Sequence, residues 1–509
     1  MKLLSKMSLR MGMSLLLIIL QMVAIIAVTI LILTRFPLVS YAGMFISFLV
    51  FLFLLKKDET TIYRMTWIII VLLLPSVGGV IYLLLGKEHF VRRSIYAHVK
   101  EHEIVAKLMD SDGNLPFVNQ VTCGRMFSLM KYIRRSSSYH AYENTESKYY
   151  SMGAPMFEDM LKSISQAEKF IFFEYFIVCK GAMWDRLVTE LEKKAAEGVE
   201  VRLIVDDFGS QKLFTNIYIA ELRSKNIQVL RFNPLIPFFL VFMNNRDHRK
   251  ILVVDGKTAF VGGMNIADEY IGLNNRLGVW KDTGLRLKGE AVWSFTLMFI
   301  EMWDTFCKTC ERINTHTFYK AETDDTYTTD GLILPYGDSP LNRDRLGENI
   351  YIEILNQAQR YVYIFTPYLI ISEKMIHALQ MAARRGVDVR IVTPGVPDKK
   401  LVFRLTRSYY SSLLEDGVRI FEYSPGFLHA KSFVSDDEVA VVGTINLDYR
   451  SLYLHFENAV LLYRASSITD IRDDALQAIA ESREVILAER KKQTISMIDA
   501  LLHLFAPLM

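Results

Sequence analysis

The sequence predicts an α/β protein built from two similar sandwich halves that follow an apolar N-terminal segment. Three observations predict this fold class. Strand-like and helix-like patterns alternate from residue 169 onward, the same alternation returns from residue 360, and the longest apolar runs lie within the first 90 of the 509 residues. Strands that alternate with helices are typical of α/β domains, and a recurring unit indicates an internal duplication.

The first 90 residues are predicted to form a transmembrane anchor. Apolar segments lie at 13–34, 38–55 and 66–85, and about 20 apolar residues are enough to cross the core of a bilayer. Pro75 and the Gly78–Gly79 pair interrupt the third segment, so a bent or re-entrant element is the alternative there. Basic residues flank the segments on both sides, so the positive-inside rule leaves the orientation open.

The rest of the chain divides into a connector at 91–145, a first α/β domain at 146–330 and a second at 331–509 with a C-terminal helix. The domains correspond in sequence. GVEVRLIV begins at residue 198 and GVDVRIVT begins at residue 386, each after a strand-like and a helix-like stretch. Two halves of one ancestral unit can pack together and contribute residues to a shared cleft.

The clearest duplication is a pair of motifs rich in catalytic residue types. The first copy, HRKILVVDGKTAFVGGMN, spans 248–265, and the second, HAKSFVSDDEVAVVGTIN, spans 429–446. Histidine, lysine, aspartate, glycine and asparagine recur in register. The candidate catalytic residues are therefore His248, Lys250, Asp255, His429, Lys431 and Asp436, with Asn265 and Asn446 as phosphate-binding or orienting residues.

The spacing of histidine and lysine indicates phosphodiester chemistry. Residues i and i+2 of a strand point to the same face, so each motif presents an imidazole and an ammonium group together. Lysines can neutralise the non-bridging oxygens of a phosphate. One histidine can attack phosphorus while the other protonates the leaving alcohol. This chemistry needs no metal ion and no cofactor, and either histidine could be the nucleophile.

The motif pair resembles the signature of the phospholipase D superfamily. The flanking segments TPYLI (366–370), YSPGFLHAKSF (423–433) and VGTINLDYRS (442–451) are similar to its cardiolipin synthase branch. The resemblance implies two phospholipase D-like halves in a multi-pass protein of the bacterial plasma membrane. It also implies transfer of a phosphatidyl group from one phosphatidylglycerol to another, giving cardiolipin and glycerol through a phosphohistidine, with His248 as the nucleophile.

The motif aspartates are expected to have a structural role, although they belong to the candidate catalytic set. Asp255 and Asp436 lie seven residues after their histidines, at positions typical of hairpin turns. Better partners for the imidazoles are Asp282 and Glu457, each before a strand-like run downstream of one motif. The resemblance supports this role, although an aspartate and six extra residues make Asp282 the less regular match. Histidines outside the motifs, among them His455, are expected on the surface or in packing roles.

Other functions remain as alternatives. A phospholipase D-type hydrolase, or a transferase with another acceptor alcohol, would use the same residues. The weak net charge of +3 argues against nucleic acid as a partner, and it is compatible with a bilayer surface. A non-catalytic membrane scaffold is the alternative of another class. The apolar loop 231–243 is expected to contact lipid or to be buried, and the oligomeric state stays open.

Overall fold

The computed structural model forms two compact units, which are described separately. Unit 1 comprises Met1–Tyr96 and Pro234–Asn245, and unit 2 comprises Ala97–Asn233 and Arg246–Met509. The structure describes residues 34–57, 61–85, 89–110, 124–234, 245–307, 312–313, 316–321, 327, 331–342 and 344–488, with isolated positions between 17 and 31. Most of the apolar run at 13–34, most of the loop 231–243 and the tail after 488 lie outside these residues.

Unit 1 contains a long apolar helix and a broken one. Among the described residues, α2 (Pro37–Lys56) alone is long and apolar enough to cross a membrane, with a mean hydropathy of 2.4. The predicted span 66–85 is not one helix, because a turn at Pro75 separates α3 (Thr61–Leu73) from α4 (Gly78–Leu85). Neither piece has the ~20 residues of a membrane span, so the alternative of a bent element is confirmed.

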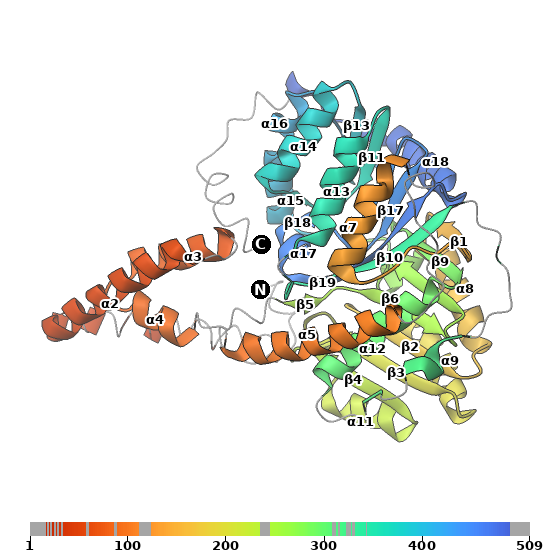
Figure 1. Ribbon diagram of the computed structural model, residues 1–509, viewed down its shortest axis with the longest axis horizontal. Helices are drawn as coiled ribbons and strands as arrows, with labels where there is room; N and C mark the ends of the chain where they lie inside the picture. Colours follow the sequence, from red (N-terminus) through yellow and green to blue (C-terminus); the bar gives the residue numbers. More distant parts are fainter. Residues whose placement is uncertain are drawn as a thin grey trace. The chain divides into compact units, whose positions relative to one another are not determined.

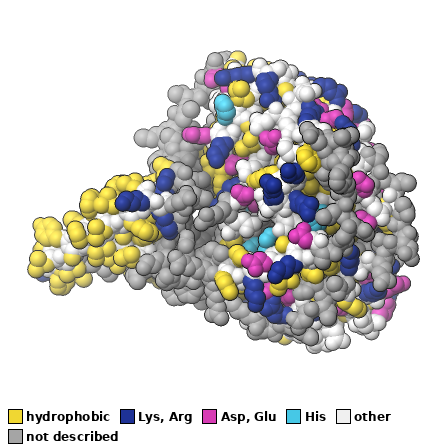
Figure 2. Space-filling model, in the orientation of Figure 1, with side chains coloured by type: hydrophobic (Ala, Val, Ile, Leu, Met, Phe, Trp, Pro, Cys, Tyr) yellow, Lys and Arg dark blue, Asp and Glu magenta, His cyan; other side chains and the backbone are white. Residues whose placement is uncertain are grey.

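Small residues let α2 approach the α3–α4 hairpin closely. The Gly79 amide donates to Ser47 Oγ at 2.8 Å, and a Cβ on Gly43 would collide with the Ser76 carbonyl. Such contacts are typical of helices packed in lipid. The outer faces of the helices carry exposed apolar side chains, among them Leu38 and Phe45, and Figure 2 shows this hydrophobic surface in yellow. An apolar surface of this extent marks a membrane or protein contact.

Unit 2 contains two large mixed sheets (Figure 1), and the two have the same strand order. The first runs β1-β9-β7-β6-β2-β3-β4 and the second β10-β19-β17-β16-β11-β13-β14-β20. The first seven positions correspond one to one, which confirms the duplication. The strands are β1 (Thr145–Tyr150), β2 (Phe170–Tyr175), β3 (Glu200–Asp206), β4 (Ile227–Phe232), β6 (Lys250–Val254), β7 (Thr258–Gly262) and β9 (Gly284–Gly289), then β10 (Leu332–Asp338), β11 (Tyr361–Phe365), β13 (Asp388–Pro394), β14 (Arg419–Tyr423), β16 (Ser432–Ser435), β17 (Val439–Gly443), β19 (His455–Tyr463) and β20 (Ser482–Glu484).

Helices cover the outer face of each sheet and bury separate cores. The first sheet carries α8 (Gly153–Ser165), α9 (Ala182–Ala196) and α11 (Asn216–Ser224). The second carries α7 (Phe127–Ser137), α13 (Leu346–Gln357), α14 (Glu373–Arg384), α15 (Lys400–Ser408) and α16 (Tyr410–Leu414). Thus α7, from the segment predicted as a connector, packs on the second half. The parallel pairs β2–β3 and β11–β13, each joined by a helix, are the predicted βαβ units.

A third core joins the halves. It contains residues of both sheets, of α12 (Val292–Phe306) and of α18 (Ser467–Ala480), and also Val105 and Met109 of α5 (His89–Asp110). Each of α12 and α18 packs on its own sheet and on the edge strand of the other half. The continuous core fixes the halves relative to each other. The segment after α18 begins with a strand, because Ser482–Glu484 pairs with the open edge of β14.

Candidate active site

Two backbone bridges between the halves position the motif histidines. The short strand β5 (Arg246–Asp247) pairs in parallel with the start of β19, and β15 (Gly426–Leu428) pairs in parallel with β8 (Val279–Lys281). His248 follows β5, and its amide donates to the Phe456 carbonyl at 2.9 Å. His429 follows β15, and its amide donates to the Lys281 carbonyl at 2.7 Å. Each histidine therefore lies beside an acidic residue of the opposite half.

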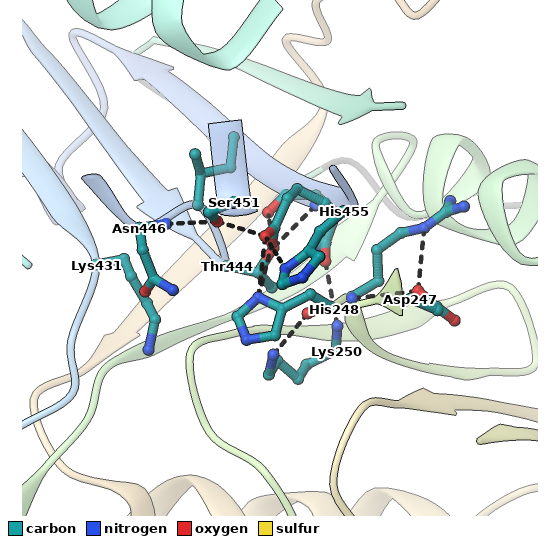
Figure 3. Close-up of polar contacts among 12 residues, drawn as sticks. Asp247, His248, Lys250, Lys431, Thr444, Asn446, Ser451 and His455 are labelled. Carbon is teal, nitrogen blue, oxygen red and sulfur yellow. Dashed lines mark hydrogen bonds and ion pairs between the residues drawn. The ribbon is translucent and has the colours of Figure 1, made fainter. Parts of the chain in front are cut away.

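The carboxylates orient the histidines in a crossed arrangement. His248 Nδ1 lies 3.0 and 2.9 Å from the two carboxylate oxygens of Glu457 (Figure 3). His429 Nδ1 lies 2.6 Å from Asp282 Oδ2. Both acids predicted to orient imidazoles do contact one, but each contacts the histidine of the other half. With Nδ1 of His248 bound to Glu457, the Nε2 atom of that ring is the one available for chemistry.

The two motif lysines add positive charge beside the two histidines. Lys250 and Lys431 are each 1% exposed. Lys250 Nζ donates to the His248 carbonyl at 2.5 Å. Lys431 Nζ donates to the His429 carbonyl and lies 2.7 and 3.1 Å from Nδ1 and Nε2 of the same residue. Burial lowers the pKa of Lys250 to about 7, with a further contribution from Lys431 of the other half, and burial lowers the pKa of Lys431 to about 8. A bound anion would stabilise both ammonium groups.

Both imidazoles are neutral in this environment. Burial lowers the pKa of His248 to about 3, and burial together with Lys431 and Lys250 lowers the pKa of His429 well below its ordinary value. A neutral imidazole that donates from Nδ1 to a carboxylate carries a lone pair on Nε2. The rings also lie among aromatic side chains, with Phe176 centred 5.0 Å from His248 and Tyr270 and Trp280 centred 5.5 and 5.8 Å from His429.

The two carboxylates differ in their hydrogen bonds. Glu457 also accepts from the hydroxyls of Thr444 and Ser451. Burial raises the pKa of the Glu457 carboxyl, but its interactions with the neighbouring imidazoles of His248 and His455 together hold the pKa well below the ordinary value. Burial raises the pKa of Asp282 to about 6. Glu457 is therefore the more firmly ionised partner.

The position that corresponds to Thr444 in the first half is Gly263. It offers no hydroxyl to Asp282, and a Cβ there would lie only 2.1 Å from Asp282 Oδ1. The first half thus combines an aspartate, which is shorter than glutamate, with a neighbouring glycine that has no side chain. The backbone amide of Thr283 donates to Asp282 Oδ1 at 2.9 Å.

The motif aspartates hold hairpins rather than imidazoles. Asp255 accepts from the backbone amides of residues 168–170 at 2.8–2.9 Å, and Asp436 accepts from those of residues 359–361 at 2.8–3.0 Å. Both have positive φ angles, 53° and 58°, and so do the residues that follow them, as in the two central residues of a type I′ turn. The motif pattern placed Asp255 and Asp436 in the candidate catalytic set, and these bonds favour the structural alternative.

The two motif asparagines have different surroundings. Asn265 Oδ1 accepts from the Ile177 amide at 3.1 Å, and its Nδ2 donates to the Tyr270 hydroxyl at 2.7 Å. Asn446 Oδ1 is buried and has no hydrogen-bond partner among the described residues, and Figure 3 shows this side chain beside Lys431. Because Asn265 uses both polar atoms of its amide within the protein, Asn446 is the better candidate for donating its amide N–H to a phosphate.

Sequence reasoning missed three residues at this site, namely Thr444, Ser451 and His455. His455 is not a surface residue, because its side chain is 9% exposed and its ring is centred 5.5 Å from that of His248. Its position two residues before Glu457 on β19 was the available signal, since residues i and i+2 share a face of a strand. Thr444 and Ser451 lie in VGTINLDYRS, but nothing in the sequence indicated that their hydroxyls meet Glu457.

Comparisons with known proteins agree with this architecture. A family model described as "Cardiolipin synthase, PLD-like domain" matches residues 160–303 and 351–478, and one described as "Phospholipase_D-nuclease N-terminal" matches residues 45–87. A cardiolipin synthase of Alkalihalophilus pseudofirmus is 32% identical over 87% of this chain and 88% of its own. The chain belongs to the cardiolipin synthase branch of the phospholipase D superfamily. The resemblance drawn from the motif pair is thereby confirmed.

Other members extend the comparison. An uncharacterised protein of Streptococcus mutans is 42% identical over 90% of this chain and 99% of its own. A crystal structure of phosphatidylserine synthase from Haemophilus influenzae covers 74% of this chain and 96% of its own, with a TM-score of 0.55 and 15% identity. At that identity the likeness shows the fold alone, and it supports the two phospholipase D-like halves of this cardiolipin synthase family member.

Proposed function

We propose that this protein is a membrane-anchored cardiolipin synthase that transfers a phosphatidyl group from one phosphatidylglycerol to a second, forming cardiolipin and glycerol. The observation that carries the proposal is the crossed pair of histidine–carboxylate contacts beside two buried lysines. This arrangement offers two imidazole Nε2 atoms and two ammonium groups to one phosphodiester. The membership of the cardiolipin synthase branch supports phosphatidylglycerol as the substrate.

In the first step, the phosphodiester anion of the donor lipid lies against Lys250 and Lys431. The lone pair of His248 Nε2 attacks phosphorus, and the bond from phosphorus to the glycerol oxygen breaks. His429, protonated when the anion is bound, gives its Nε2 proton to that oxygen, so glycerol leaves as a neutral alcohol. The phosphorylated imidazole keeps its Nδ1 proton, which Glu457 stabilises.

In the second step, the terminal hydroxyl of a second phosphatidylglycerol takes the place of the departed glycerol. His429, now neutral, accepts the proton of that hydroxyl while the hydroxyl oxygen attacks phosphorus. The phosphorus–nitrogen bond breaks, and His248 recovers its Nε2 lone pair. Cardiolipin is released, and His429 is protonated again for the next cycle.

The difference between the two carboxylates supports His248 as the nucleophile. A nucleophilic imidazole needs a partner that stays ionised, so that Nδ1 keeps its proton and Nε2 keeps its lone pair. Glu457, with its two hydroxyl donors, meets this requirement. Asp282, with a pKa raised to about 6, is better suited to a histidine that repeatedly gains and loses a proton.

The apolar N-terminal unit supports a location in the bacterial plasma membrane. We place α2 across the bilayer, with the apolar run 13–34 as a second span, which makes the protein multi-pass. The α3–α4 hairpin packs against α2 as a shorter, re-entrant element. Anchoring would keep the active site at the surface where its lipid substrates are concentrated.

The decisive experiment gives the purified full-length protein phosphatidylglycerol alone, in mixed micelles, and identifies the products by mass spectrometry. Cardiolipin and glycerol in equal amounts are expected. Phosphatidic acid as the main product would instead indicate a hydrolase. Added small alcohols would reveal another acceptor if their phosphatidyl esters outcompeted cardiolipin. A double His248→Ala and His429→Ala variant that left cellular lipid composition unchanged would favour the scaffold.

A further inference from the structure

We propose that His248, His455 and Glu457 form a binding site for a divalent transition-metal ion of the zinc type, and that the bound ion inhibits the enzyme. The binding stands on geometry alone. The inhibition also depends on the proposed function, because it acts through the role of His248 as the nucleophile.

The three side chains offer a suitable set of ligands. One nitrogen of each imidazole and one oxygen of the carboxylate lie within 4.8 Å of one another. Two histidines and one glutamate are a common zinc ligand set that leaves a fourth position open. All three side chains are at most 9% exposed, so an ion there would be held in a largely dehydrated site.

His455 is the independent observation that points to a ligand. Both of its ring nitrogens are buried and have no hydrogen-bond partner among the described residues. Its Nδ1 atom lies 3.7 Å from Glu457 Oε1, which is too far for a hydrogen bond. A buried polar group without a partner is unfavourable, and an ion bound between His455 and Glu457 would supply the missing interaction.

The surroundings fit an ion with a small adjustment. Zinc bonds of about 2.1 Å hold tetrahedral ligand atoms about 3.4 Å apart, and the ligand atoms here lie up to 4.8 Å apart, so the most widely separated pair must approach by up to about 1.4 Å. His455 can make this movement, since no hydrogen bond fixes its ring. The hydroxyls of Thr444 and Ser451 hold the Glu457 carboxylate in place, as outer partners of metal ligands do. The nearby Lys250 and Lys431 oppose a cation and make the site weaker than a structural zinc site.

The consequence for catalysis comes from the tautomer of His248. An ion on Nδ1 needs the lone pair of that nitrogen, so the single proton of the neutral ring must lie on Nε2. No proton is gained or lost in this exchange. A protonated Nε2 has no lone pair with which to attack phosphorus, so metal binding and the first step of transfer exclude each other.

The test uses the detergent-solubilised full-length protein and zinc sulfate. Calorimetry measures zinc affinity without substrate, and the visible absorption of added Co²⁺ reports nitrogen ligation. Loss of one ligand in His455→Asn should weaken zinc binding by about tenfold or more. The zinc concentration that gives half-inhibition should rise by a similar factor in this variant. Inhibition is measured relative to the metal-free activity of the same variant. EDTA should restore the activity of the zinc-treated wild type.

Two histidine variants serve as controls. His377 is exposed on α14, and His102 lies with its Nδ1 3.2 Å from Glu301 Oε1, in another imidazole–carboxylate contact. His377→Asn and His102→Asn should both bind zinc as the wild type does. Wild-type affinity in His455→Asn, or loss of affinity in His102→Asn, would overturn the proposal. If the protein binds zinc in a way that depends on His455 but makes no cardiolipin, the proposed function is wrong and the metal site is still supported.

Discussion

Replacement of Glu457 by glutamine tests the central feature of the site. The Glu457 side chain is fully buried and receives hydrogen bonds from His248 Nδ1, Thr444 and Ser451. Glutamine keeps the volume of the side chain but removes its charge and one acceptor. An amide N–H directed at His248 makes Nδ1 an acceptor, which moves the imidazole proton to Nε2. The nitrogen that attacks phosphorus then has no lone pair.

The expected loss is large. In a serine protease, an aspartate-to-asparagine change that imposes the wrong histidine tautomer lowers kcat about 10⁴-fold. Because each tenfold change corresponds to about 1.4 kcal/mol, such a loss raises the barrier by about 5.5 kcal/mol. We expect kcat of Glu457→Gln to fall about 10³–10⁴-fold. The KM for phosphatidylglycerol should change little, because Lys250 and Lys431 remain.

The assay follows cardiolipin formation in mixed micelles by mass spectrometry, with circular dichroism as a check of folding. Glu301→Gln is the matched control. Glu301 is also a buried glutamate that receives a hydrogen bond from a hydroxyl, that of Tyr139, and contacts His102 Nδ1, but it orients neither motif histidine. This variant should lose stability and keep kcat in its folded fraction. If Glu457→Gln stays within about tenfold of the wild type, or if Glu301→Gln loses as much, the assignment of Glu457 is refuted.

Three further predictions concern charge and folding. Because the pKa of Lys250 is lowered to about 7 and that of Lys431 to about 8, the free enzyme loses its ammonium charges as pH rises through this range. The kcat/KM measured against pH should therefore fall above about pH 7, and a flat profile to pH 10 would contradict this. Lys431→Met should lower kcat/KM by about 10²–10³ in the same assay, as loss of a preorganised charge does. Asp436→Ala should lower the free energy of unfolding in urea by about 3 kcal/mol, whereas the 59% exposed Asp473 should contribute no more than about 1 kcal/mol.

Local features of the fold could be predicted from the sequence because short segments specify them. The alternation of strand and helix gave β2, α9 and β3 and their counterparts in the second half. The turn residues Asp255–Gly256 and Asp436–Asp437 have the positive φ angles that their position between paired strands requires. The spacing of histidine and lysine was only partly informative, because Lys250 begins β6 and Lys431 directly precedes β16, whereas both histidines lie in the links before these strands. Each of these inferences needs only the periodicity of one element.

The crossing of the carboxylates could not be predicted in that way. Glu457 and His248 are 209 residues apart in the chain, and Asp282 and His429 are 147 apart. Their meeting depends on the short parallel bridges β5–β19 and β15–β8, which involve only two or three residues per strand. Strands this short have no recognisable pattern of their own. The packing of α7 on the second half could not be predicted for the same reason, because the residues that it contacts there are far away in the sequence.

In the proposed mechanism, the crossed contacts make the two halves a single catalytic unit. His248 without Glu457, or His429 without Asp282, would lack the group that sets its tautomer, so neither half holds a complete site. Because both halves belong to one chain, the two pairs can also differ, which a symmetric dimer of identical halves cannot achieve. Thr444 donates a hydrogen bond to Glu457, whereas Gly263, the corresponding residue of the first half, lies beside Asp282 and has no side chain to donate one.

The same argument applies to the residue two positions before each acid. It is His455 beside His248, and it is Trp280 beside His429. The His248–Glu457 pair thus has hydroxyl donors and an additional imidazole beside it. The His429–Asp282 pair has aromatic neighbours and a carboxyl whose pKa is raised to about 6. In the proposed mechanism, two nearly identical motifs acquire distinct chemical roles through the residues that the opposite half places around them. A nucleophile and an acid–base can therefore arise from one duplicated sequence.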